Sequence, residues 1–209
     1  MYIAIEGVIG VGKTTLARLL QPTFDAEVLL EIFEENPFLS DFYGDRDRYA
    51  FQTQMFFLLS RYHQQRRNVP ELLAKNENLL SDYTFAKDSL FARINLEGDE
   101  LEMYGRIHEA LAEKIRHPDL LVFLRAENQT LMERIAMRDR PYERDMDSGY
   151  IADLGRTYAE FFSKPYNSTP VLTIDTDDLD FVRSPEDLKF IKDRIENALK
   201  ATPLQPDLI

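Results

Sequence analysis

The residues with the clearest chemical potential form one segment near the start of the chain, Gly7-Val8-Ile9-Gly10-Val11-Gly12-Lys13-Thr14. It fits the pattern GxxxxGK[ST] without a mismatch, between an apolar stretch and a helical pattern. Glycines let successive backbone N–H groups turn inward around phosphate oxygens, and the following helix dipole favours the same anion. We expect this loop, including Lys13 and Thr15, to bind ATP, and the Thr14 hydroxyl to bind Mg²⁺. A chance glycine-rich turn is the alternative, which the strand–loop–helix order disfavours.

A second basic feature is the stretch 134–144, which holds Arg134, Arg138, Arg140 and Arg144. Arg134 and Arg138 share a helical face, and Arg140 precedes Pro141, where a helix should break. A mobile segment of this kind could close over the triphosphate, neutralise charge on the transferring group and exclude water, which favours transfer over hydrolysis. Alternatively, it is a solvated basic helix face.

Carboxylates stand at the ends of two predicted strands. Because the carboxyl ends of parallel strands face the ligand crevice, Glu31 could accept a proton from an acceptor hydroxyl that attacks the γ-phosphate. Glu34 and Glu35 lie close by, so the residues alone leave this choice open. Asp82 stands where an acidic residue assists magnesium in this architecture. Either strand-end carboxylate could instead be a helix cap.

Gln54 and Arg61 are seven residues apart on a predicted helix and therefore face the same way. An amide and a guanidinium beside aromatic side chains could read the edge of a flat heterocycle while the rings stack on it. The neighbouring apolar residues could equally be core. They are Phe51, Met55, Phe56, Phe57, Leu58 and Leu59.

Short apolar runs alternate with helical patterns, which predicts βαβ units around a parallel sheet. We expect strands at Tyr2–Glu6, Val28–Ile32, Leu79–Asp82, Leu120–Leu124 and Val171–Ile174, and helices at about 13–21, 47–67, 86–94, 99–116, 128–138, 148–163 and 185–199. Pro37–Asp47 should be a loop, Pro70 should close the long helix, and the tail ATPLQPDLI should be irregular.

Composition narrows the class of protein. A chain of 209 residues suits one domain, and its formal charge of −12 disfavours a protein that binds nucleic acid polymers. No apolar run reaches the length of a membrane span, and the N-terminus lacks the features of a signal peptide. With no cysteine there is no disulfide framework. We expect a cytoplasmic protein that does not bind membranes.

Together these residues resemble the deoxynucleoside kinases, in particular the bacterial deoxyadenosine and deoxyguanosine kinases, from the first strand to at least Tyr158. The resemblance selects Glu31, in Glu31-Ile32-Phe33-Glu34-Glu35-Asn36-Pro37, as the general base. It also implies that Tyr43 and Glu143 contact the 3′-hydroxyl of the deoxyribose, and that Gln54, Arg61 and Asp88 orient the base. The stretch Thr176–Phe181 resembles the segment that wraps the adenine of ATP.

The chain departs from the family pattern at Asp82-Tyr83-Thr84, because Tyr83 stands where the family usually has an arginine. The acidic member is kept, so the resemblance still assigns Mg²⁺ to Thr14 and Asp82.

The resemblance implies a single domain over 1–209. We expect a P-loop NTPase-type three-layer sandwich with a five-stranded parallel sheet and an arginine-rich lid at about 134–147. The expected reaction is ATP-dependent 5′-phosphorylation of a deoxynucleoside, with a preference for purines, in nucleotide salvage. Lys13 and the lid residues Arg134, Arg138 and Arg140 would stabilise the phosphoryl group, with Arg138 also binding ATP. A homodimer is implied as well.

Two rival functions can be compared with this reading. A nucleoside monophosphate kinase such as a thymidylate kinase must bind an anionic acceptor, yet no arginine lies within ten residues of Glu31. A GTPase-type switch should carry an Asn-Lys-x-Asp guanine specifier. The pairing found here, Lys75-Asn76, runs in the wrong order.

Overall fold

The computed structural model describes residues 1–32, 35–164, 166 and 169–201. Five short strands pair in parallel in the order β2-β3-β1-β4-β5, and the three central ones, β3, β1 and β4, are buried for nearly their whole length. They are β1 (Tyr2–Gly7), β2 (Glu27–Leu29), β3 (Leu79–Ser81), β4 (Leu120–Arg125) and β5 (Val171–Asp175). The predicted five-stranded parallel sheet is therefore confirmed. Because β2 and β3 lie on one side of β1, and β4 and β5 on the other, the loop after β1 lies at the topological switch point.

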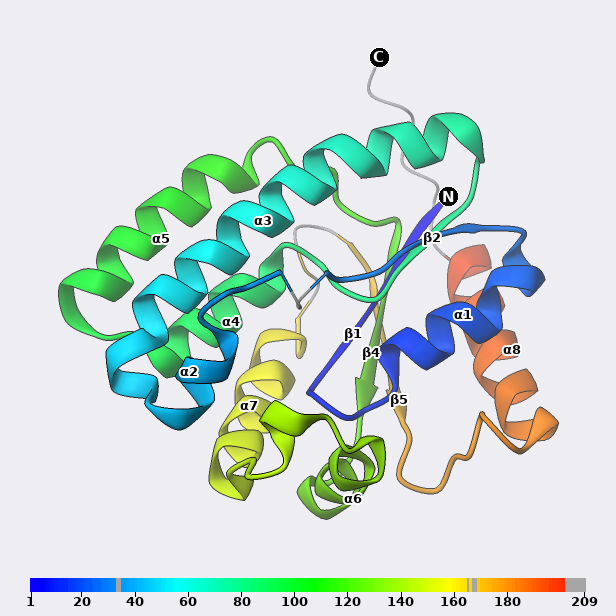
Figure 1. The fold of residues 1–209 in the computed structure, drawn as a ribbon. Helices are drawn as coiled ribbons and strands as arrows, with labels where there is room; N and C mark the ends of the chain where they lie inside the picture. The colour runs from blue at the N-terminus through cyan, green and yellow to red at the C-terminus, as the bar shows by residue number, and fades with distance from the viewer. Residues whose placement is uncertain (33–34, 165, 167–168, 202–209) are drawn as a thin grey trace.

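Helices cover both faces of the sheet (Figure 1). One face is covered by α1 (Lys13–Phe24) and α8 (Pro185–Ala201), and the other by α3 (Arg46–Lys75), α4 (Ala86–Asn95) and α7 (Ser148–Phe161). Outside α3 and α4 lies α5 (Gly98–Ala112). Near the carboxyl ends of the strands lie α2 (Leu39–Gly44), α6 (Asn128–Arg138) and a 3₁₀ turn (Pro141–Glu143). Within the described part of the chain, no helix combines the length and the apolar composition needed to cross a membrane.

The long helix α3 continues past Pro70, so the prediction that this proline closes the helix is wrong. Proline removes one backbone hydrogen bond from the helix. The last turns nevertheless pack on the sheet, because Val69 is buried in an apolar cluster with Tyr2 and Leu79, and Leu72 packs against it. Burial of these side chains offsets the missing bond, and the helix ends at Lys75.

The segment predicted as a loop, Pro37–Asp47, contains the short helix α2. The Asn36 side chain sets its start, since its Oδ1 accepts the Phe38 N–H (3.0 Å) and its Nδ2 donates to the Thr53 carbonyl (3.2 Å) on α3. Phe42 of α2 is buried, and it thereby fixes which side of this helix faces the core. The turn-forming residues of this segment favoured a loop over a helix in the sequence. The helix places Tyr43 at the candidate active site.

Four other elements, β2, β3, α5 and α7, end earlier than predicted, β2 and α5 by the most. The second strand stops at Leu29 rather than at Ile32, because the Glu31 N–H donates to Asp82 Oδ1 (2.8 Å) instead of to a strand neighbour. Helix α5 ends at Ala112 rather than at 116. The predicted irregular tail lies outside the described residues, apart from Ala201 at the end of α8.

Candidate active site

The loop between β1 and α1 has a backbone that glycine alone accepts without strain at two positions. Gly10 has φ +89° and Gly12 has φ +101°. A Cβ atom at Gly10 would lie 2.8 Å from Cγ1 of Ile135, and one at Gly12 would lie 2.8 Å from Cζ of Phe181. The loop is thus held tightly between α6 and the segment after β5, with its N–H groups at the start of α1.

Lys13 begins α1 and folds back across this loop. Its ammonium donates to the carbonyls of Gly7 (2.7 Å) and Val8 (3.0 Å). Burial and the neighbouring Lys87 charge lower the pKa of Lys13 to about 8. The ammonium therefore lies where it can reach a phosphate held by the loop.

Thr14 and Asp82 form a pair of hard oxygen ligands. The Thr14 hydroxyl donates to Asp82 Oδ2, while Asp82 Oδ1 accepts the backbone N–H of Glu31. Within the described ranges, no cluster of three or more histidines and acids could hold a metal. Mg²⁺, however, commonly uses one or two protein ligands and completes its shell with substrate phosphates and waters. A hydroxyl and a carboxylate at the end of a phosphate loop fit that ion.

Glu31 lies two residues beyond β2, between two cations. Its Oε1 accepts from Nε (3.0 Å) and Nη2 of Arg61, and its Oε2 accepts from the Lys87 ammonium. Burial would raise the pKa of this carboxyl, but Arg61 and Lys87 outweigh it and hold the pKa well below its usual range. Glu31 is therefore ionised at neutral pH.

Arg61 links two carboxylates, Glu31 and Asp88. Its Nη1 donates to Asp88, and its guanidinium lies 4.4 Å from the ring centroid of Phe57. Asp88 is fully buried behind Arg61 and is not among the residues that line the cavity holding Glu31. Gln54 and Arg61 line the inner cavity, and Asp88 holds Arg61 from behind.

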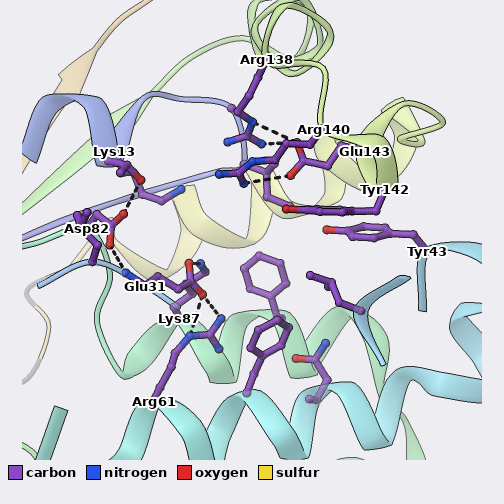
Figure 2. A pocket seen from close by; sticks show the side chains of 18 of the residues that line it. Lys13, Glu31, Tyr43, Arg61, Asp82, Lys87, Arg138, Arg140, Tyr142 and Glu143 are labelled. Carbon is purple, nitrogen blue, oxygen red and sulfur yellow. Dashed lines mark hydrogen bonds and ion pairs between the residues drawn. The ribbon is translucent and has the colours of Figure 1, made fainter. Parts of the chain in front are cut away.

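Opposite this floor lies the arginine-rich segment (Figure 2). Arg138 donates to Glu143 Oε2 through Nε (3.2 Å) and Nη2 (2.5 Å), and Nη1 of Arg140 lies 3.6 Å from Glu143 Oε1. The Tyr142 ring stacks on that of Tyr43, with centroids 6.1 Å apart. The arginine-rich segment and α2 thus meet above Glu31 and Arg61.

Arg134 lies apart from the other two arginines. Its Nη1 donates to Thr176 Oγ1 (3.0 Å), and its Nη2 donates to the Thr176 carbonyl (2.7 Å). Arg134 therefore fastens the segment after β5 to α6, and it does not reach the cavity that holds Glu31.

Two adjoining cavities result. The inner cavity, of about 220 Å³, is lined by Glu31, Tyr43, Gln54, Phe57, Arg61, Asp82, Lys87, Phe91, Tyr142 and Glu143 among others. The outer cavity, of about 990 Å³, is lined by Gly12, Thr15, Arg134, Met137 and residues 177–183 among others. Both are bordered by Gly10, Lys13, Thr14, Arg18, Arg138 and Arg140. The two cavities therefore adjoin at the phosphate loop and at Arg138 and Arg140.

Sequence reasoning missed several residues that line the inner cavity, among them the polar residues Lys87 and Tyr142. Lys87 directly precedes Asp88, and Tyr142 lies between Arg140 and Glu143, so proximity to motif residues was the available signal. Among the acidic residues near Glu31, Glu35 is exposed, and Glu34 lies outside the described residues.

Known proteins resemble this chain in both sequence and architecture. The family model described as deoxynucleoside kinase matches residues 3–200. Deoxyguanosine kinase of Bacillus subtilis (strain 168) is 34% identical over 201 residues, which cover 95% of this chain and 97% of that relative. Deoxyadenosine kinase of Dictyostelium discoideum is 33% identical over 178 residues, 83% of this chain and 71% of the relative.

A solved structure supports the fold. Deoxyadenosine kinase from M. mycoides with bound dATP superposes with a TM-score of 0.81 at 24% identity, covering 94% of this chain and 99% of that one. This likeness concerns the P-loop NTPase architecture. With the family match over nearly the whole described chain, it leads to one conclusion: the chain belongs to the deoxynucleoside kinase family.

Proposed function

We propose that the chain transfers the γ-phosphoryl group of ATP to the 5′-hydroxyl of a deoxynucleoside, with deoxyadenosine and deoxyguanosine preferred, as a step of nucleotide salvage. One observation carries this proposal: Glu31 stands in the inner cavity, and Lys13, Arg138 and Arg140 form the wall shared with the outer cavity. The purine preference is supported by the printed names of the relatives, deoxyguanosine kinase and deoxyadenosine kinase.

In the proposed reaction, the 5′-oxygen bonds to the γ-phosphorus as the bond to the β,γ-bridging oxygen breaks, and ADP leaves with that electron pair. Glu31 accepts the 5′-hydroxyl proton. Its low pKa makes it a weak base, which suits a loose transition state in which positioning and electrostatics dominate. Lys13, Arg138 and Arg140 balance the charge of the phosphoryl group.

Mg²⁺ held by Thr14 and Asp82 would neutralise charge on the β- and γ-phosphate oxygens. The hydrogen bond from the Glu31 N–H to Asp82 keeps the base and the metal ligand in one fixed arrangement.

The remaining residues of the inner cavity would bind the nucleoside. Gln54 and Arg61 present polar groups to a base edge beside the Phe57 ring, while Tyr43 and Glu143 would contact the deoxyribose. The wider proposal, which rests on the family resemblance, adds Asp88 in base selection, a lid at about 134–147, a homodimer and a cytoplasmic location.

Initial rates with MgATP and each of the four common deoxynucleosides, or with dTMP, test this function. We expect turnover of deoxyadenosine or deoxyguanosine, and a loss of about 10²–10⁴-fold in Glu31→Gln. The neighbouring exposed residue offers a matched control, Glu35→Gln, which should keep the activity. Turnover of dTMP without deoxynucleoside activity would favour a nucleoside monophosphate kinase and contradict the proposal.

A further inference from the structure

Tyr83 gives no charge to the inner cavity. Its side chain is fully buried in the apolar cluster that also contains Tyr2 and Leu79, and its hydroxyl donates to the side chain of Gln64. Tyr83, which stands where the family usually has an arginine, thus serves the packing between α3 and the sheet.

Lys87 brings a cation to the same neighbourhood from the first turn of α4. Its side chain is 8% exposed, lines the inner cavity and lies with Nζ 5.5 Å from the ring centroid of Phe91. Among the described residues, Glu31 is the only acceptor to which the Lys87 ammonium donates. An ammonium has three N–H donors, so two of them are left for a ligand in the cavity.

The charges around Lys87 favour an anion. Burying an ammonium is costly unless it is paired, yet the carboxylate of Glu31 is already shared with Arg61. Lys13 and Lys87 both line the inner cavity, Lys13 on the wall that it shares with the outer cavity. A negatively charged group placed between these two ammonium groups would be attracted to both.

We propose that Lys87 is a catalytic residue that contacts the transferring phosphoryl group and the attacking 5′-oxygen. This inference rests on the proposed function. In the transfer, the 5′-hydroxyl proton passes to Glu31, the new O–P bond forms as the old one breaks, and Lys87 stays protonated throughout. Its contribution is electrostatic, and it supplies a cation that Tyr83 does not.

A purely structural role for Lys87 would be to orient Glu31, and a double-mutant cycle separates the two roles. If Lys87 touches the phosphoryl group, Lys87→Met lowers kcat by about 10²–10³-fold, and Lys87→Arg restores part of the loss. In the double variant Glu31→Gln/Lys87→Met, the residual rate of Glu31→Gln should fall by about a further tenfold. Equal rates for Glu31→Gln and Glu31→Gln/Lys87→Met would overturn the proposal.

Lys75→Met is the matched control, because Lys75 also pairs with a glutamate, Glu27, but lies on an exposed part of α3. It should keep the wild-type kcat. If Lys87→Met does not fold, Glu31→Gln/Lys87→Gln removes both charges of the pair and is compared with Glu31→Gln in the same way.

A binding measurement gives an independent readout. Isothermal titration of ADP and aluminium fluoride, in the presence of the accepted deoxynucleoside, should show weaker binding to Lys87→Met, while the affinity for ADP alone stays near that of wild type. Unchanged aluminium fluoride binding would count against the contact. A wild-type protein without deoxynucleoside kinase activity would instead refute the proposed function, whereas full activity in Lys87→Met would refute this inference alone.

Discussion

Replacing Arg61 by methionine removes the cation that holds two carboxylates at the floor of the inner cavity. Arg61 is 5% exposed and donates to both Glu31 and Asp88. After the replacement Glu31 keeps Lys87, but Asp88 loses its cation, and its Oδ2 already has no hydrogen-bond partner among the described residues. Removing one partner of a buried ion pair costs about 3–5 kcal/mol, against about 0.3–0.5 kcal/mol for an exposed helical pair.

We therefore expect Arg61→Met to lower the free energy of unfolding by about 3–5 kcal/mol, which for a chain of this size corresponds to a fall in Tm of about 6–20 °C. Urea unfolding and thermal melts measure both quantities. The control is Arg106→Met, which removes an exposed pair with Glu102 on α5 and should cost about 0.5 kcal/mol or less.

A second variant tests the physical reason. Asp88→Asn removes the buried charge, so Arg61→Met/Asp88→Asn should be more stable than Arg61→Met by about 1 kcal/mol or more. A cost below about 1 kcal/mol for Arg61→Met, or no gain from Asp88→Asn in that background, would refute the reasoning.

Three further predictions concern other parts of the chain. Gly10→Ala should weaken ATP binding, measured by calorimetry, about tenfold or more, since alanine is strained at positive φ and its Cβ meets α6. Burial lowers the pKa of His108 below its unfolded value, so stability in urea should fall as the pH drops below about 6.5, and less so in His108→Asn. With the pKa of Lys13 lowered to about 8 by burial and Lys87, kcat/KM for ATP should fall as the pH rises through that value, but not in Lys13→Arg.

Each of these three has its own control or contrary result. Gly155→Ala, in the middle of α7 with open space around the new Cβ, should leave ATP affinity unchanged. His63→Asn, on the exposed side of α3, should lose as much stability in urea as wild type when the pH drops below about 6.5. A kcat/KM profile for ATP that stays flat to about pH 9 would contradict the lowered pKa of Lys13.

The phosphate loop could be predicted because its physics is local: glycines at fixed spacing, a strand before and a helix after. The strands were also predictable, since the central ones are buried on both faces and therefore form short apolar runs. The end of α3 was not, because the packing of Val69 and Leu72 on the sheet outweighs the local effect of Pro70. Nor was α2, whose start depends on a bond from Asn36 to a carbonyl on α3.

In the candidate site, too, local patterns could be predicted from the sequence, whereas contacts between distant segments could not. Gln54 and Arg61 could be paired from helix periodicity, and Glu31 from its place after a strand. Asp88 lies behind Arg61 and accepts a hydrogen bond from it, an arrangement that sequence spacing does not reveal. Lys87 was missed because its partner Glu31 stands 56 residues away, on another element.

Phosphoryl transfer to the 5′-oxygen is the central claim, and phosphorus NMR of the product tests it most directly. With MgATP and the accepted purine deoxynucleoside, the account predicts one nucleoside monophosphate per ADP, its phosphorus coupled to the 5′ protons. ADP formed without a phosphorylated nucleoside, or phosphate on any other oxygen, would contradict it.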